Sequence, residues 1–236
     1  MASPQTASDE GQGMAINRSV NTLPVSVAAA QLARVAGDGS ARHLHLTALL
    51  EGVGRHSGRD MADAVHLLCS LHGHYPGLVE IALQRCPKGP VRDWLSHASD
   101  AFERERLYLV RLTSAVGPLP STPGAAETES SLVAARHALE TLATSERDGC
   151  ALGAATALVC DWWPIRRLLD RAAARVGTDA PAPSLPDESS VVAIVDRAAV
   201  NPGCSRALAF GGEQLLLQHR ALLDLLEARA EARGEY

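Results

Sequence analysis

Apolar residues recur at intervals of three and four along most of the chain, and this spacing places them on one face of an α-helix. Alternating patterns typical of β-strands are scarce. Two proline-containing loops, 117–124 and 180–186, separate the longer segments. The periodicity predicts helices over residues 25–35, 44–53, 59–72, 76–85, 90–116, 125–147, 150–176, 188–200 and 205–233. Such helices, joined by short loops, favour an all-α fold, a single-domain antiparallel helical bundle of about eight helices.

The helical region defines the expected domain. Residues 1–22 are polar and lack the apolar segment of a signal peptide, so we expect a disordered tail there. Residues 23–236 are expected to form one all-α domain, because a chain of 236 residues can bury one sizeable core. The longest apolar run, residues 150–160, is too short to cross a bilayer, so no membrane association is expected.

Composition narrows the range of partners. The net charge is −5 and aromatic residues make up only 3%, so the chain lacks the basic surface and the stacking residues that nucleic-acid binding needs. Five cysteines without a C-x-x-C pair argue against a disulfide framework or a structural zinc site. Reduced thiols fit a cytoplasmic protein.

Ionisable side chains occupy positions where helical periodicity predicts buried apolar residues. Burying such a group is costly unless it is paired or bound. Glu105 is the sharpest case, because it fills the centre of the apolar stripe from Val91 to Val116, whereas Glu103 faces the other way. The four candidates, from four predicted helices, are His72, Glu105, Asp161 and His219.

Each candidate also has a purely structural interpretation. Glu105 could pair with a buried arginine, and His72 could be stabilised by the dipole at its helix C-terminus. His219 could be a hydrogen-bonded core histidine. Asp161 precedes Trp162-Trp163-Pro164, so it could accept from an indole or from a backbone amide freed by the proline.

Two function hypotheses from different classes follow. The first is a binding or regulatory module with a pocket between helices for a small molecule or a protein partner. The second is a metal-dependent enzyme, with Glu105 and Asp161 as catalytic carboxylates and with His72, Glu105, Asp161 and His219 as ligands suited to iron or manganese. The cofactor is left unknown. A third alternative is a homo-oligomer that associates through exposed apolar helix faces, with positions such as Leu216 and Leu217.

Other signals are weaker. Asp63-x-x-His66 is a helical neighbour pair on the face opposite the apolar stripe. Gly211-Gly212 lies inside the last predicted helix at a cost of about 1 kcal/mol per glycine, so it indicates either a close backbone approach or a helix start at Glu213; we favour the helix start. Phosphate loops, nucleophile elbows and H-E-x-x-H motifs are absent from the sequence.

Four strings together resemble a small family of alphaproteobacterial proteins without an assigned function: LHGHYPG, GPLPSTPG, GCALGAATALVCDWWPIRRLLDRAA and LLDLLEARAEARG. The resemblance covers the chain from about residue 40 onward and implies no functional residue. Two looser analogies concern architecture alone. The long helices are similar to the haem-oxygenase/TenA-type fold, although Gly211-Gly212 lies too near the C-terminus for a distal haem helix. A ferritin-like di-iron bundle needs Glu-x-x-His on two helices, and only Asp63-x-x-His66 is available.

Overall fold

The computed structural model describes Met1 and residues 26–52 and 57–234. Within these residues the chain forms nine α-helices and one short 3₁₀ helix and contains no strand, which confirms the all-α prediction. Apart from Met1, the predicted tail (1–22) lies outside the described residues. The elements are α1 (Val27–Asp38), η1 (Ser40–Arg42), α2 (Leu44–Glu51), α3 (Ser57–His72), α4 (Leu78–Arg85), α5 (Pro90–Ala115), α6 (Ala125–Ala143), α7 (Cys150–Val176), α8 (Glu188–Ala198) and α9 (Pro202–Gly234).

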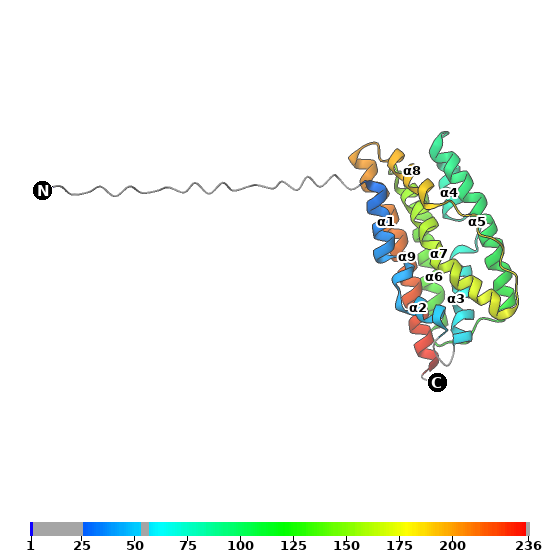
Figure 1. The fold of residues 1–236 in the computed structure, drawn as a ribbon. Coiled ribbons are helices and arrows are strands. Elements are labelled where there is room, and N and C mark those ends of the chain that lie inside the picture. The colour runs from blue at the N-terminus through cyan, green and yellow to red at the C-terminus, as the bar shows by residue number, and fades with distance from the viewer. Residues whose placement is uncertain (2–25, 53–56, 235–236) are drawn as a thin grey trace.

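The helices form an elongated bundle, with α1 and α9 on one side and α4 and α5 on the other (Figure 1). The most extensive contact joins α7 to α9, and these two helices run parallel. Gly153 lies against Leu208, and Asp161 lies against His219, so residue numbers rise together along both helices. The bundle therefore combines parallel and antiparallel neighbours, because α3 runs antiparallel to α9.

Two glycines allow the backbones of α7 and α9 to approach closely. A Cβ atom on Gly211 would lie 2.0 Å from the carbonyl oxygen of Cys150, and one on Gly153 would lie 2.0 Å from that of Leu208. Our prediction of a helix start at Glu213 is therefore wrong, since α9 runs through both glycines of Gly211-Gly212 without interruption. The close-approach alternative holds, because side chains at these positions would force the helices apart.

Helix α7 runs through Pro164 as one element. A proline removes one main-chain hydrogen bond and crowds the preceding turn, and the long flanking segments maintain the helix on both sides. Pro90 opens α5 at its first turn, where the missing N–H costs nothing. Gly177 ends α7 in the left-handed conformation that glycine adopts without strain.

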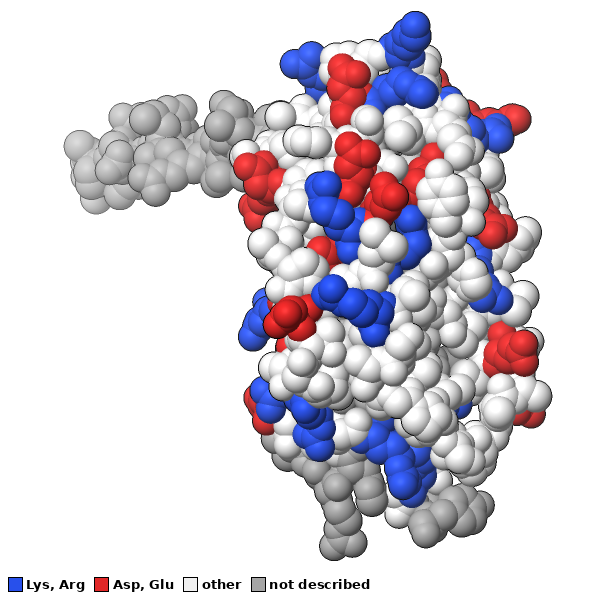
Figure 2. Space-filling view, turned by 90° about the vertical axis from the view of Figure 1, so that its right-hand side faces the viewer, with Lys and Arg blue, Asp and Glu red and all other residues white. Residues whose placement is uncertain are grey.

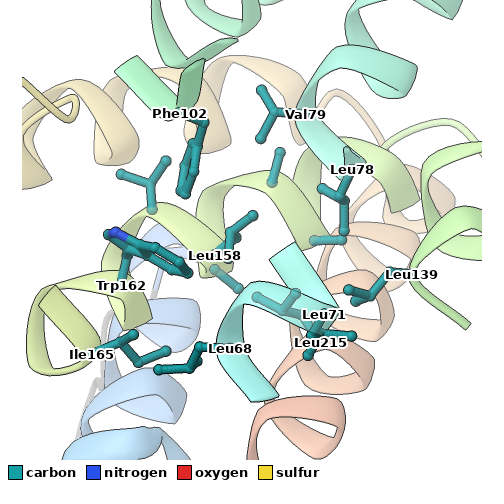
Figure 3. Close-up of a cluster of buried hydrophobic side chains, with 14 of the residues drawn as sticks. Leu68, Leu71, Leu78, Val79, Phe102, Leu139, Leu158, Trp162, Ile165 and Leu215 are labelled. Atoms are coloured by element: carbon teal, nitrogen blue, oxygen red, sulfur yellow. The ribbon is translucent and has the colours of Figure 1, made fainter. Parts of the chain in front are cut away.

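One continuous apolar core fills the bundle. Figure 3 shows part of it, where Leu71 of α3 and Phe102 of α5 converge on Leu158 and Trp162 of α7. Leu216, which we grouped with exposed apolar positions, is buried, whereas Leu217 is exposed.

A buried ion-pair network ties the start of α3 to the end of α9. Asp63 is fully buried and accepts from Arg229 at 2.7 and 2.9 Å and from Arg233 at 2.6 Å. Asp60 accepts from Arg233 at 2.8 Å. The sequence pattern placed Asp63 on the face of α3 opposite the apolar stripe and so gave no sign of this ion pair. In the structure, α9 covers Asp63 on that face.

None of the helices in the described residues is long and apolar enough to span a membrane. Acidic and basic side chains are interspersed on the face shown in Figure 2. That mixture is typical of solvated helix surfaces.

Candidate functional site

Asp161 and His219 form a buried pair between α7 and α9. His219 Nδ1 lies 2.7 Å from Asp161 Oδ2, and both side chains are 1% exposed. Ser40 donates to the same carboxylate from its backbone N–H (2.7 Å) and from its hydroxyl (2.6 Å). Gly39 makes this approach possible, because a Cβ there would lie 2.5 Å from Asp161 Oδ1. The carboxylate is therefore held by three donors.

His72 extends this pair toward the other side of the bundle. Its Nε2 lies 3.1 Å from His219 Nε2, and its ring meets the Trp162 ring edge to face at 5.2 Å between centroids. Burial, with smaller contributions from His219 and Arg106, holds the pKa of His72 well below its usual value. We name Ser40, Asp161, His219 and His72 the polar chain.

The positions of the hydrogen atoms along the polar chain can be deduced from the groups that must accept them. Asp161 accepts at Oδ2, so Nδ1 of His219 carries a hydrogen. One hydrogen must lie between the two facing Nε2 atoms. With both rings neutral, it belongs to His72, and His72 Nδ1 then carries a lone pair. That nitrogen makes no hydrogen bond within the described part of the chain.

Glu105 belongs to a neighbouring network. It accepts from the indole of Trp162 at 2.9 Å and from Arg166 at 2.6 Å, so both carboxylate oxygens are occupied. Arg166 also donates to Asp170 at 2.7 Å and to the carbonyl of Pro181. Glu105 thus pairs with a buried arginine, as its structural interpretation proposed. The indole N–H of Trp162 donates to Glu105 and not to Asp161.

The structure brings three of the four candidates together but does not arrange them around one point. His219 lies between His72 and Asp161 and uses both ring nitrogens, whereas Glu105 meets the polar chain only through the Trp162 ring. A shared ion would need lone pairs converging within a few ångströms. Here the donor atoms are committed to hydrogen bonds with one another, to Ser40 and to Arg166.

Another group of metal-ligand types lies on the surface. His43, Asp224 and Glu227 bring possible ligand atoms within 4.8 Å of one another. His43 Nδ1 accepts from the backbone N–H of His45 at 3.2 Å, and Nε2 lies 2.9 Å from Asp224. This pattern puts the hydrogen of a neutral ring on Nε2. In this arrangement the ring donates to Asp224, so a cation bound here would have to displace the hydrogen on Nε2.

The polar chain ends at a cavity, which we name the His72 cavity. Its volume is about 50 Å³, room for roughly three or four water molecules. Its apolar wall is visible in Figure 3, where Leu78 and Val79 of α4 face Phe102, Leu158 and Trp162. The other lining residues are Leu71, His72, His74, Pro76, Gly77, Glu80, Ile81, Arg106, Leu109, Arg136, Leu139 and Glu140.

Two arginines contribute the positive charge of the cavity lining. Arg106 donates from Nη2 to Glu80 Oε1 at 2.6 Å, while Glu80 Oε2 accepts from the backbone N–H of Gly77 at 2.8 Å. The buried Nε of Arg106 is left without a hydrogen-bond partner in the described residues. Arg136 donates to two neutral acceptors, the carbonyl of Ser70 at 3.2 Å and His74 Nε2 at 2.8 Å.

Sequence reasoning missed Arg106 and Arg136 of the cavity lining and Ser40 of the polar chain. Arg106 follows Glu105 directly, so its position beside the apolar stripe of α5 was a usable signal. Ser40 and Arg136 gave none, because their roles depend on which helices are neighbours in space. Of the four predicted site residues only His72 lines the cavity; Asp161 and His219 stand behind it, and Glu105 stands behind Trp162.

Residues 35–234 match the model of a family of unknown function, DUF6975, and the chain belongs to that family. The match includes the polar chain and every residue of the His72 cavity. It bears out the resemblance to a family without an assigned function. A search of curated proteins and of solved structures finds no match.

Proposed function

We propose that this protein is a binding module that holds a small molecule in the His72 cavity. One observation carries the proposal: a buried chain of hydrogen bonds from Ser40 through Asp161 and His219 ends at His72, which lines the cavity. Burying an aspartate and a histidine is costly, and the fold maintains both to position one ring.

The groups left unsatisfied favour a ligand over a purely structural network. A structural network gains most when every buried member has its partner. Here Nε of Arg106 is buried without a hydrogen-bond partner in the described residues, and Nδ1 of the half-buried His72 makes no hydrogen bond there either. Both residues line the same cavity, whereas the other buried side-chain atoms without a partner, on Gln31, His45 and Arg233, belong to residues outside the lining. A molecule that supplies the missing partners would complete the set, since buried polar groups in proteins are nearly always paired.

Each predicted site residue then has a definite role. His72 contacts the ligand, while Asp161 and His219 are positioning residues that fix its ring and its tautomer. Glu105 fixes the indole of Trp162, which forms part of the apolar wall. Its pairing with Arg166 gives it a positioning role rather than a catalytic one.

The test is retention of a small molecule by the intact protein. The protein is incubated with a low-molecular-weight cell extract, separated from free solutes and examined by native mass spectrometry. We expect a bound mass that Ile81→Trp abolishes, because Ile81 is half-buried and lines the cavity. Leu83→Trp is the control, on the same helix and half-buried but outside the lining. No bound mass, or equal retention by Ile81→Trp, would contradict the proposal.

A further inference from the structure

We infer that the ligand is a small hydroxycarboxylate, with its carboxylate on the guanidinium of Arg106 and its hydroxyl donating to Nδ1 of His72. This inference rests on the proposed function and names the chemical class that the site selects. It is carried by the hydrogen-bonding capacity left open on two residues that line one cavity and by the apolar residues that share this lining.

Arg106 supplies the carboxylate site. Nε and Nη2 form one edge of a guanidinium, the edge that Arg229 uses to bind both oxygens of Asp63. On Arg106 only Nη2 of this edge is paired, because Glu80 turns its second oxygen toward Gly77. The Nε donor remains buried and unpartnered. A carboxylate oxygen is the acceptor that such a donor binds most strongly.

The surrounding charges favour an anion. Arg136 donates only to neutral acceptors, so its positive charge has no acidic partner at salt-bridge distance within the described residues. The two acids that line the cavity differ: Glu80 is buried and already paired with Arg106, whereas Glu140 is exposed to solvent, which screens it. Leaving out the exposed residues, the lining therefore carries two half-buried guanidinium groups against one buried carboxylate.

His72 supplies the second recognition group. With both rings neutral, Asp161 fixes the hydrogen of His219 on Nδ1, and His219 Nε2 then accepts from His72 Nε2. This order leaves His72 Nδ1 as an acceptor, so the matching ligand group is a donor such as a hydroxyl. The order can be reversed: an asparagine at position 161 can donate to His219 Nδ1, which moves every hydrogen along the polar chain and turns His72 Nδ1 into a donor.

The experiment compares three fluorinated probes by fluorine NMR titration. Trifluorolactate carries both groups, trifluoropropanoate lacks the hydroxyl, and trifluorolactamide lacks the charge. For the natural protein we expect trifluorolactate to bind about tenfold more tightly than the amide and about three- to tenfold more tightly than trifluoropropanoate, the differences expected for one charge-assisted and one neutral hydrogen bond.

Two variants assign these preferences to their residues. Arg106→Lys keeps a positive charge for Glu80 but removes Nε, so we expect about a tenfold loss of affinity for both acids. Arg167→Gln, an exposed position on α7, is the control and should leave both affinities unchanged. His72→Phe should cancel the preference for the hydroxyl, because it keeps an aromatic ring at this position but removes the Nδ1 acceptor.

Histidine-selective nitrogen NMR of the unliganded protein tests the same inference without any variant. We expect His219 as the Nδ1–H tautomer and His72 as the Nε2–H tautomer. A hydrogen on His72 Nδ1 would overturn the inference, as would equal binding of trifluorolactate and trifluoropropanoate. If the acids fail to bind while the native mass spectrum shows a bound mass that Ile81→Trp removes, the inference fails and the proposed function stands. If both are absent, both fail.

Discussion

Gly153→Ala is expected to weaken the contact on which the polar chain depends. The new Cβ would lie 2.0 Å from the carbonyl oxygen of Leu208 and 2.8 Å from its Cα. Both neighbours are backbone atoms of a helix, so no side chain can rotate away. Helix α9 must therefore shift by an amount on the order of 1 Å before ordinary van der Waals contact is restored.

The free energy of unfolding reflects three contributions. Replacing glycine by alanine inside a helix gains about 1 kcal/mol. Overpacking of a well-filled interface costs about 1–3 kcal/mol. The shift also lengthens the 2.7 Å bond between His219 and Asp161, and a bond to a charged group contributes about 1.5–3 kcal/mol. We expect a net loss of about 3 kcal/mol.

The assay is urea unfolding followed by circular dichroism. Gly37→Ala is the matched control, because that glycine lies in α1 with open space around its Cβ position, and it should gain about 0.5 kcal/mol. At roughly 2–4 °C per kcal/mol, Gly153→Ala should melt about 6–12 °C below the natural protein. If Gly153→Ala is as stable as Gly37→Ala, α9 can accommodate a side chain there and the close-approach argument is wrong.

Three further results are expected. Glu105→Gln should lower the free energy of unfolding by about 3 kcal/mol, because it leaves the buried Arg166 poorly paired, whereas the exposed Glu103→Gln should change it by less than about 0.5 kcal/mol in the same urea assay. Burial lowers the pKa of His72, so below about pH 6.5 the folded state binds fewer protons than the unfolded state. The contribution of His72 to the free energy of unfolding should therefore be complete above that pH and should fall by up to about 1.4 kcal/mol per pH unit as the pH is lowered. Urea unfolding at several pH values should show a shallower fall for His72→Gln than for the natural protein. Removing metal ions with EDTA should leave the melting temperature unchanged, because the donor atoms of Glu105, Asp161 and His219 are engaged in protein hydrogen bonds; a metal bound at about one per chain and lost in Glu105→Gln would refute this interpretation.

The helices and the presence of buried polar groups could be predicted because both follow from local periodicity. Glu105 interrupts an apolar stripe whose members between the two ends are buried, and any helix placed against that stripe would have to contact it. The same argument identified Asp161 and His219, since a buried acid and a buried histidine need partners wherever they lie. Helical periodicity thus identified the ionisable residues that are buried at a cost in free energy, but it did not identify the groups with which they pair.

The partners could not be predicted because they depend on how helices far apart in the sequence pack together. Asp63 was assigned to a polar face, but α9 covers that face and brings Arg229 and Arg233 to it. Gly211 looked like a helix boundary because sequence alone does not show that the backbone of α7 touches it. Assigning the indole of Trp162 to Glu105 instead of Asp161 required the relative rotation of α5 and α7.

The parallel arrangement of α7 and α9 has a consequence for how the protein is assembled in time. Parallel neighbours require a connection that returns along the molecule, and here residues 177–201 provide it. During synthesis α7 therefore emerges well before the helix that pairs with it. Until α9 docks, Asp161 lacks His219 and Asp63 lacks its arginines. The position of the His72 ring is consequently among the last features to be fixed, because His219 of α9 is its hydrogen-bond partner. A chain interrupted before α9 would leave Asp63 without its arginines and Asp161 with the two donors of Ser40 alone.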